Sequence, residues 1–410
     1  MKVCLSVWLL LILSNHGFAQ SDRVEHWQQD IDYYAKQMVA RHIDPFSVLS
    51  ESDFRAELKR IRSTLSHKTD NQILIDLMRL TRRIGDGHTA FPLWKETFER
   101  FPIRFKKIEN TVRVIETTTE YAALLGATLI SINGVSAAEA FKAMATVAPF
   151  TENPYSESIS AASYLASAVA LNGLGMIPNT QHAQFIFAIN GKQQRIVMAS
   201  DTNPKFTNAL SHFNDNLFSP HEQINDDLWF GSTANHKTVY VKFRRYPSAS
   251  DMSAFAEDLL EFINEHESKN LIIDLRDNYG GDFFVGLILA QPLVLADSID
   301  WKSGVYTLID GVTFSAAMSN AAQYTQILNS KLVGTPTGAR PSGYQDMGQF
   351  QLPNSGHTVT YSKRLYHFKE DGKDALYPDH HVAITFKDYM NGYDRQLRWV
   401  LKTLDKPSEK

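Results

Sequence analysis

The chain has 410 residues with a formal net charge of −4 at pH 7, and 43% of its residues are hydrophobic. This apolar content is sufficient for a real core, and the length suggests two or three domains. Acidic and basic residues are interspersed. The sequence therefore has neither the basic stripe of a nucleic-acid-binding protein nor the polybasic patch of a membrane-surface protein.

Residues 1–19 are predicted to be a secretory signal peptide. Lys2 precedes an apolar stretch, "VCLSVWLLLILS", and "GFA" ends in a small residue at Ala19. The segment is too short and wrongly flanked for a membrane span, which disfavours the alternative of an uncleaved anchor. Cleavage after Ala19 would export the protein to a periplasm or the extracellular space. Cys4, the only cysteine, lies inside this segment, so the mature chain would have no disulfide or thiolate nucleophile.

Residues 20–95 are predicted to form a helical N-terminal segment. "SESDFRAELKRIRSTL" begins with a capping serine, Ser50, and places apolar residues at helical spacing. "DNQILIDLMRLTRRIG" ends at Gly85, which is typical of a left-handed helix end, and "DGHTAF" follows at once.

Residues 96–200 are predicted to be a small α+β module. A strand, an Asn133-Gly134 turn and a helix follow one another, and "AQFIFAINGKQQRIVMAS" indicates a hairpin that turns at Asn190-Gly191. Residues 201–235 are rich in polar side chains and are predicted to be a linker or a long surface loop.

Residues 236–405 alternate between strand and helix patterns. This alternation predicts an α/β domain with a mostly parallel sheet that is covered by helices. In such sheets, ligands bind beyond the C-terminal ends of the strands. Both "DNYGGD" and "DGVTFS" follow buried strands and therefore fall at that edge.

Ser315 in "LIDGVTFSAAM" lies where a helix begins. Taken alone, it would be an ordinary N-cap. Gly280-Gly281, after the neighbouring strand, adds bare backbone amides at the same edge of the sheet. Two converging amides are what an oxyanion hole requires, and each donor can lower a reaction barrier by about 3 kcal/mol.

Several segments resemble the tail-specific (C-terminal processing) serine protease family. They occur in the family's order between about residues 70 and 385, and the resemblance extends to the branch that is similar to the tricorn protease core. It implies a ClpP/crotonase-like catalytic core, a reduced PDZ-like module at 96–200, and hydrolysis of peptide or protein substrates without a cofactor. The matching segments are "GDGHTAF", "LLGATLISINGVSAAEAF", "NLIIDLRDNYGGD", "TFSAAM", "LVGTPTGAR", "LPNSGHTVTYSKR" and "LYPDHHV".

The resemblance also implies roles for individual residues. Ser315 is the nucleophile, and the amides of Gly281 (or Gly280) and Ala316 form the oxyanion hole. Where bacterial members have a general-base lysine, this chain has Arg340, and a guanidinium cannot accept a proton in a protein.

The tricorn-like branch uses a histidine as the base, and His88 stands at its position. A histidine can accept the proton of the serine at neutral pH. A supporting carboxylate is expected from Glu370, Asp371 or Asp374, of which Asp374 is preferred. Arg340 is expected to bind a substrate carboxylate or to brace its loop.

Other charged residues favour structural roles. Asp274 and Arg276 are expected to form a buried pair. No metal site is predicted, because His357 and His367 have no partner at ligand spacing and His380 and His381 are expected at the surface. The histidines expected to be surface residues or to lie in a hairpin are His357, His367, His380 and His381. Two alternatives to a peptidase stay open: a non-catalytic ligand- or peptide-binding protein on the same fold, and an esterase.

Overall fold

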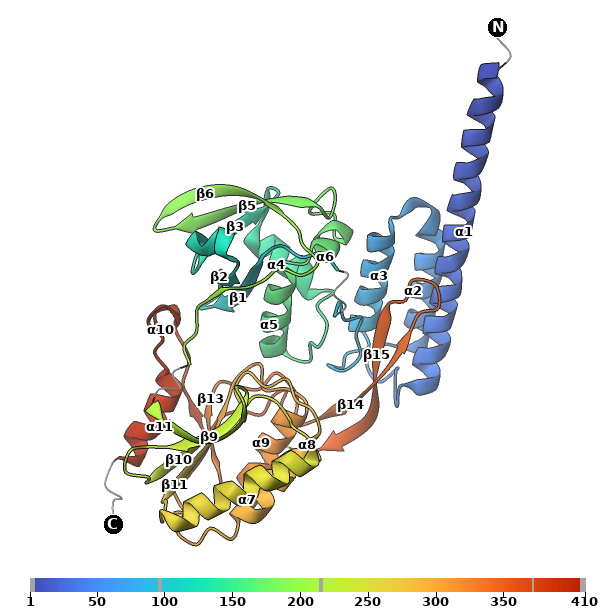
Figure 1. The fold of residues 1–410 in the computed structure, drawn as a ribbon. Helices are drawn as coiled ribbons and strands as arrows, with labels where there is room; N and C mark the ends of the chain where they lie inside the picture. Colours follow the sequence, from blue (N-terminus) through green and yellow to red (C-terminus); the bar gives the residue numbers. More distant parts are fainter. Residues whose placement is uncertain (1–3, 95–97, 214–216, 371, 406–410) are drawn as a thin grey trace.

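A computed structural model describes residues 4–94, 98–213, 217–370 and 372–405, with the backbone alone for residues 4–20. Figure 1 shows an N-terminal group of helices and two main sheets, of which the second is covered by helices. Each of these sheets has seven strands in the described residues. The sheet within residues 103–209 is called the smaller sheet below, because a shorter part of the chain forms it, and the sheet within residues 219–381 is called the larger sheet. Among the helices of the described residues, none combines the length and apolarity needed to cross a membrane. The first helix includes most of the predicted signal peptide, whose cleavage stays a prediction.

The N-terminal helices pack through apolar faces. Tyr34 and Phe54 are buried between them, and the hydroxyl of Ser50 accepts the amide N–H of Asp53, as the capping pattern predicts. Gly85 has φ +92°, the left-handed conformation that suits glycine after a helix. The helices are α1 (Cys4–Arg41), α2 (Glu51–Thr64) and α3 (Asp70–Arg82), with a short 3₁₀ turn η1 (Leu65–His67).

The smaller sheet is antiparallel, with strand order β1-β2-β3-β5-β6. Both predicted turns are present, since Asn133-Gly134 and Asn190-Gly191 all have positive φ. The α+β character is therefore observed, while the PDZ-like assignment stays a prediction. The elements are β1 (Ile103–Ile108), β2 (Thr111–Thr117), η2 (Thr119–Leu124), β3 (Thr128–Ile132), β4 (Val135–Ser136), α4 (Ala137–Ala145), α5 (Pro154–Tyr164), α6 (Ala168–Gly173), β5 (His182–Ile189), β6 (Lys192–Ala199) and β7 (Asn208–Ala209).

The larger sheet has strand order β16-β13-β12-β11-β10-β9-β8 and is parallel from β16 to β10. Because strand side chains alternate between faces, one set packs against α7, α8 and α9 and the other against α11. The elements are β8 (Ser219–Asn225), β9 (Leu228–Ser232), β10 (Thr238–Phe243), α7 (Ala249–Glu265), β11 (Asn270–Asp274), α8 (Phe283–Leu293), β12 (Val305–Ile309), α9 (Ala316–Ile327), β13 (Lys331–Gly334), β16 (His380–His381), α10 (Phe386–Asn391) and α11 (Arg395–Leu404). The predicted parallel α/β architecture is present, and its ClpP/crotonase-like assignment stays a prediction.

The prediction of a linker or loop at 201–235 is wrong in part. This segment contains β7, β8 and β9, and β9 is buried along its whole length in the larger sheet. The strand "LWFGS" has only five residues and lies between polar segments, so the sequence pattern around it does not predict a strand. Pairing with β10, which lies beyond a turn, supplies the burial that the local pattern does not indicate.

A long hairpin joins the larger sheet to the N-terminal helices (Figure 1). It consists of β14 (Ser342–Gln351) and β15 (Thr358–His367), which pair with each other in a separate sheet. Its tip reaches α1, where the amide N–H of Asn354 donates to the carboxylate of Asp30 at 2.8 Å. The hairpin therefore fixes the N-terminal helices relative to the larger sheet.

Candidate active site

The loops that follow β11 and β12 meet at the C-terminal edge of the larger sheet. These strands are parallel neighbours, and their loops carry Gly280-Gly281 and Ser315. A Cβ atom on Gly280 would lie 2.8 Å from the Cβ of Ser315 and 2.9 Å from the amide nitrogen of Ala316. Gly280 also has φ +102°, so only glycine fits here without strain. The two loops are thus in direct contact, as the sequence predicts.

Ser315 occupies the N-cap position of α9 but does not act as a cap. Its hydroxyl accepts no amide N–H of the helix, and its backbone has φ 50° and ψ −124°. A non-glycine residue held in such a conformation is strained, and strain of this kind clusters at functional sites. The ordinary N-cap interpretation therefore does not describe Ser315.

Two backbone amides beside Ser315 are free to bind a ligand oxygen. Within the described part of the chain, the N–H groups of Gly281 and Ala316 have no hydrogen-bond partner. Gly280 is different, because its N–H donates to the side-chain oxygen of Asn278 at 2.8 Å. Of the two glycine amides predicted as oxyanion donors, the N–H of Gly281 is therefore the unpaired one, and its role stays a prediction.

His88 lies against Ser315, although 227 residues separate them in the sequence. The distance between His88 Nε2 and Ser315 Oγ is 2.9 Å. His88 is buried, and its ring centroid lies 5.2 Å from that of Phe314. The structure therefore forms the serine–histidine contact that the motif comparison predicts.

A buried hydrogen-bond network holds the His88 loop. The carboxylate of Asp86 accepts the backbone N–H of His88 at 2.9 Å and the hydroxyl of Ser362, on β15, at 2.6 Å. His42 Nε2 lies 2.8 Å from the other carboxylate oxygen. Burial opposes ionisation of Asp86, but its contacts with His42 and Ser362 outweigh burial and lower the pKa of the carboxyl. Sequence reasoning missed these supporting roles. Asp86 lies inside "GDGHTAF", but nothing marks His42 or Ser362.

The environment of His88 favours the neutral imidazole. Burial lowers the pKa of His88, and the charge of Asp86 and the backbone of Tyr344 oppose this shift only in part. A neutral imidazole can accept a proton at pH 7. Its other nitrogen, Nδ1, makes no hydrogen bond of ordinary geometry in the described part of the chain, so the influence of the Tyr344 backbone on the ring is a weak one. Among the described residues, no carboxylate is hydrogen-bonded to the ring.

Of the three candidate carboxylates, the two that lie in the described residues, Glu370 and Asp374, do not contact His88. Asp374 accepts a hydrogen bond from the hydroxyl of Tyr377 at 2.9 Å, and its backbone carbonyl accepts from Asn153. Glu370 is exposed and lies 3.6 Å from His367 Nδ1. Asp371 lies outside the described residues. The preference for Asp374 as a partner of the histidine is therefore not supported by its contacts.

Arg340 braces its loop. Its backbone N–H donates to the carboxylate of Glu152 at 2.9 Å, and its Nη2 donates to the Glu152 carbonyl at 3.2 Å. The guanidinium Nε is buried and has no hydrogen-bond partner among the described residues. The bracing role is thus observed, while binding of a substrate carboxylate stays a prediction.

The expected structural pair is confirmed. Arg276 and Asp274 form a buried ion pair, which Asp394 and Gln396 extend towards α11. His380 and His381 are exposed on β16, as expected. In the described ranges, no cluster of three or more histidine, cysteine or acidic side chains could hold a metal ion.

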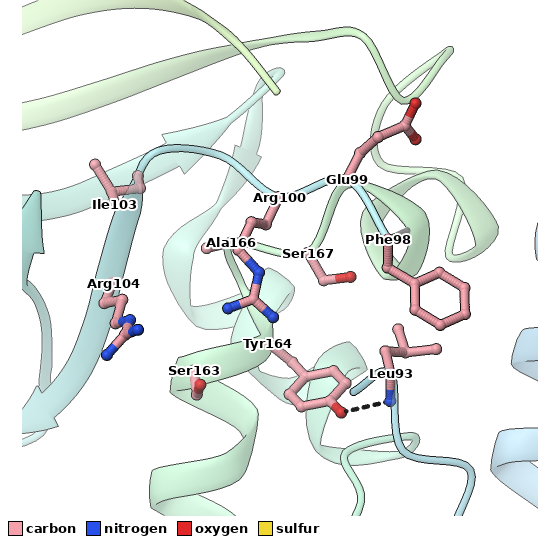
Figure 2. Close-up of a pocket in the computed structure, with 10 residues that line it drawn as sticks. All are labelled: Leu93, Phe98, Glu99, Arg100, Ile103, Arg104, Ser163, Tyr164, Ala166 and Ser167. Atoms are coloured by element: carbon pink, nitrogen blue, oxygen red, sulfur yellow. Dashed lines mark hydrogen bonds between the residues drawn. The ribbon is translucent and has the colours of Figure 1, made fainter. Parts of the chain in front are cut away.

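Two cavities differ in their relation to the site. The cavity in Figure 2 measures about 50 Å³ between β1 and α5, and the Tyr164 hydroxyl there accepts the N–H of Leu93 at 3.1 Å. Its lining includes neither Ser315 nor His88. A cavity of about 600 Å³ is lined by Tyr279, Gly280 and Val312, and by residues of β1 and α5. The larger cavity thus adjoins the Ser315 loop and offers room for an extended ligand.

Gly280→Ala is expected to disrupt the site locally. The new methyl group would meet backbone atoms of the Ser315 loop, and alanine is strained at φ +102°, at a cost of about 1–3 kcal/mol. We expect covalent labelling of Ser315 by a fluorophosphonate to fall at least ~10-fold as the oxyanion donors move. Gly134→Ala is the matched control, because Gly134 also has positive φ but open space around it. Equal labelling of the two variants would contradict the expectation that a methyl group at Gly280 disturbs the Ser315 loop.

Comparison with known proteins identifies the fold. No protein-family model and no curated protein matches the chain. The structure of mature CPAF complexed with lactacystin is similar, with a TM-score of 0.64 and 12% identity over 93% of this chain and 98% of that one. Mature CPAF alone gives a TM-score of 0.63 and 12% identity over 93% and 96%. The photosystem II D1 C-terminal processing protease covers 90% and 96% at 12% identity, but its TM-score of 0.43 is too low to argue from. At these identities, the likeness to CPAF establishes a shared fold.

Proposed function

We propose that this chain is an exported serine peptidase of the tail-specific type, with Ser315 as nucleophile and His88 as general base. The observation that carries the proposal is the 2.9 Å contact between His88 Nε2 and the hydroxyl of a serine in a strained conformation. The family motifs in the sequence and the fold shared with CPAF over 93% of the chain support it.

The chemistry follows from the positions of these groups. Ser315 Oγ attacks the carbonyl carbon of the substrate as His88 Nε2 takes the hydroxyl proton. The N–H groups of Gly281 and Ala316 stabilise the negative oxygen of the tetrahedral intermediate. Collapse breaks the C–N bond, and the departing amine takes the proton from His88. Water, activated by His88, then hydrolyses the acyl-enzyme and releases the acid.

Labelling with a fluorophosphonate probe tests the proposal. We expect one adduct that maps to Ser315 by peptide mass spectrometry. A folded protein that forms no adduct would favour the non-catalytic binder on the same fold. A peptidase and an esterase would form the same kind of acyl-enzyme, so labelling does not distinguish them. The hydrolysis rates of matched peptide and ester substrates do.

Arg340→Ala is expected to reduce the labelling rate only moderately, by about 3–10-fold. A guanidinium cannot act as the base, so the loss should reflect only its hydrogen bond to the backbone carbonyl of Glu152, which helps to hold the loop. The control is Arg55→Ala, an exposed arginine on α2. Abolished labelling in a folded Arg340→Ala protein would mean that the base is misassigned.

A further inference from the structure

Glu152 is a buried carboxyl group beside the proposed site, and the reaction steps above do not use it. It precedes α5, and only 6% of its surface is exposed. Its carboxylate accepts the backbone N–H of Arg340 at 2.9 Å, and its carbonyl accepts the guanidinium of the same residue. Glu152 therefore joins the smaller module to the Arg340 loop of the larger sheet.

Glu152 also packs against the loop that carries His88. Gly87 lies between Glu152 and Phe314, since a Cβ atom on Gly87 would lie 3.1 Å from Glu152 Cβ and 2.6 Å from the Phe314 ring. The Phe314 ring in turn contacts the ring of His88. A displacement of Glu152 would therefore move Gly87, the residue before His88, and the Phe314 ring that contacts His88.

The carboxyl of Glu152 has no cation within ion-pair distance among the described residues, since the Arg340 guanidinium bonds its carbonyl instead. Burial raises the pKa of Glu152 to about 7, and the nearby charge of Asp86 acts in the same direction. The backbone N–H groups of Arg340 and Gly87 and the charge of Arg340 oppose the shift. The Arg340 N–H donates to this carboxyl, and the Gly87 turn packs against the Glu152 side chain. An ionised carboxylate is a stronger acceptor than the protonated acid, so ionisation should tighten the hold of Glu152 on the two loops.

We propose that Glu152 is a positioning residue whose ionised carboxylate clamps the Gly87-His88 turn and the Arg340 loop together, and so sets His88 against Ser315. This inference rests on the proposed function of Ser315 and His88. A glutamine at this position offers one acceptor and one donor group in the same volume, so it would face one of the two amides with the wrong partner.

The test measures fluorophosphonate labelling rates from pH 5.5 to 9 in wild type, Glu152→Gln and Glu152→Ala. Glu157→Gln is the control, because Glu157 lies on α5, the helix that follows Glu152, but pairs with Arg82. We expect the wild type to show a rise near pH 7 that both Glu152 variants lack. Their rates at pH 8 should be about tenfold lower, as for a small misplacement of a catalytic group. A wild-type rate and pH profile in Glu152→Gln, or a loss that is the same at every pH, would overturn the proposal.

A second readout does not depend on labelling. The NMR signal of the His88 ring, assigned by its loss in His88→Ala, should show an inflection near pH 7 that is absent in Glu152→Gln. If the wild-type protein shows this inflection but never reacts with the fluorophosphonate, the positioning role of Glu152 would be supported and the peptidase proposal would fail. Identical His88 titrations in wild type and Glu152→Gln would reject the clamp. Thermal unfolding confirms that each variant is folded.

Discussion

Ser315→Ala is expected to abolish fluorophosphonate labelling and to lower peptide hydrolysis by about 10⁴-fold or more, the scale seen when a nucleophile is removed. The variant removes the only hydroxyl in contact with His88 among the described residues. It should cost almost no stability, because the Ser315 side chain caps no helix amide. The measurement combines labelling, hydrolysis and thermal unfolding of the same preparations.

Ser248→Ala supplies the contrasting control. The Ser248 hydroxyl does cap its helix, accepting the N–H of Asp251 at 3.2 Å. Loss of this cap should lower the free energy of unfolding by about 1 kcal/mol and leave labelling intact. Ser315→Ala and Ser248→Ala should thus separate reactivity from capping. Residual labelling of Ser315→Ala at the wild-type rate would place the nucleophile elsewhere.

His88→Ala is expected to remove most of the labelling rate, by about 10²–10⁴-fold, the usual contribution of a general base. The fold should persist, because the loop remains anchored through Asp86 to Ser362. His381→Ala, an exposed histidine on β16, is the control and should label normally. A His88→Ala protein with full activity would refute the assignment and favour the binding-protein alternative.

The assignment of His88 as general base also predicts how activity changes with pH. Burial lowers the pKa of His88, so its neutral, proton-accepting form should persist below the ordinary histidine value of about 6.5. Activity due to His88 should therefore rise with pH through a step below 6.5. This step should remain in Glu152→Gln, where the step near pH 7 is lost. A His88 step above pH 6.5 would contradict the effect of burial.

Sequence motifs predict the pairing of Ser315 with His88, but they do not predict the residues that hold the His88 loop. Ser315 and Gly281 follow predicted strands, so the rule for parallel sheets places them at one edge. His88 was found through the "GDGHTAF" motif alone, because no local pattern says where a loop after a helix will fold.

The supporting residues could not be read from local patterns. His42 and Ser362 reach Asp86 from 44 and 276 residues away, and each is an ordinary residue in its own segment. The spacing of Glu370, Asp371 and Asp374 does not match the family, so the sequence offers only a preference for Asp374, and the fold directs its carboxylate to Tyr377. Such contacts depend on tertiary packing that local periodicity does not encode.

The β14–β15 hairpin has a consequence for when the protein can react. It holds the His88 loop through Ser362 and reaches α1 at its tip, yet it is among the last segments to be synthesised. Neither half of the chain contains a complete set of reacting groups, and the histidine meets the serine only when both ends have folded. Under the proposed function, a chain that is still unfolded, including one that awaits the proposed export, would therefore be inactive.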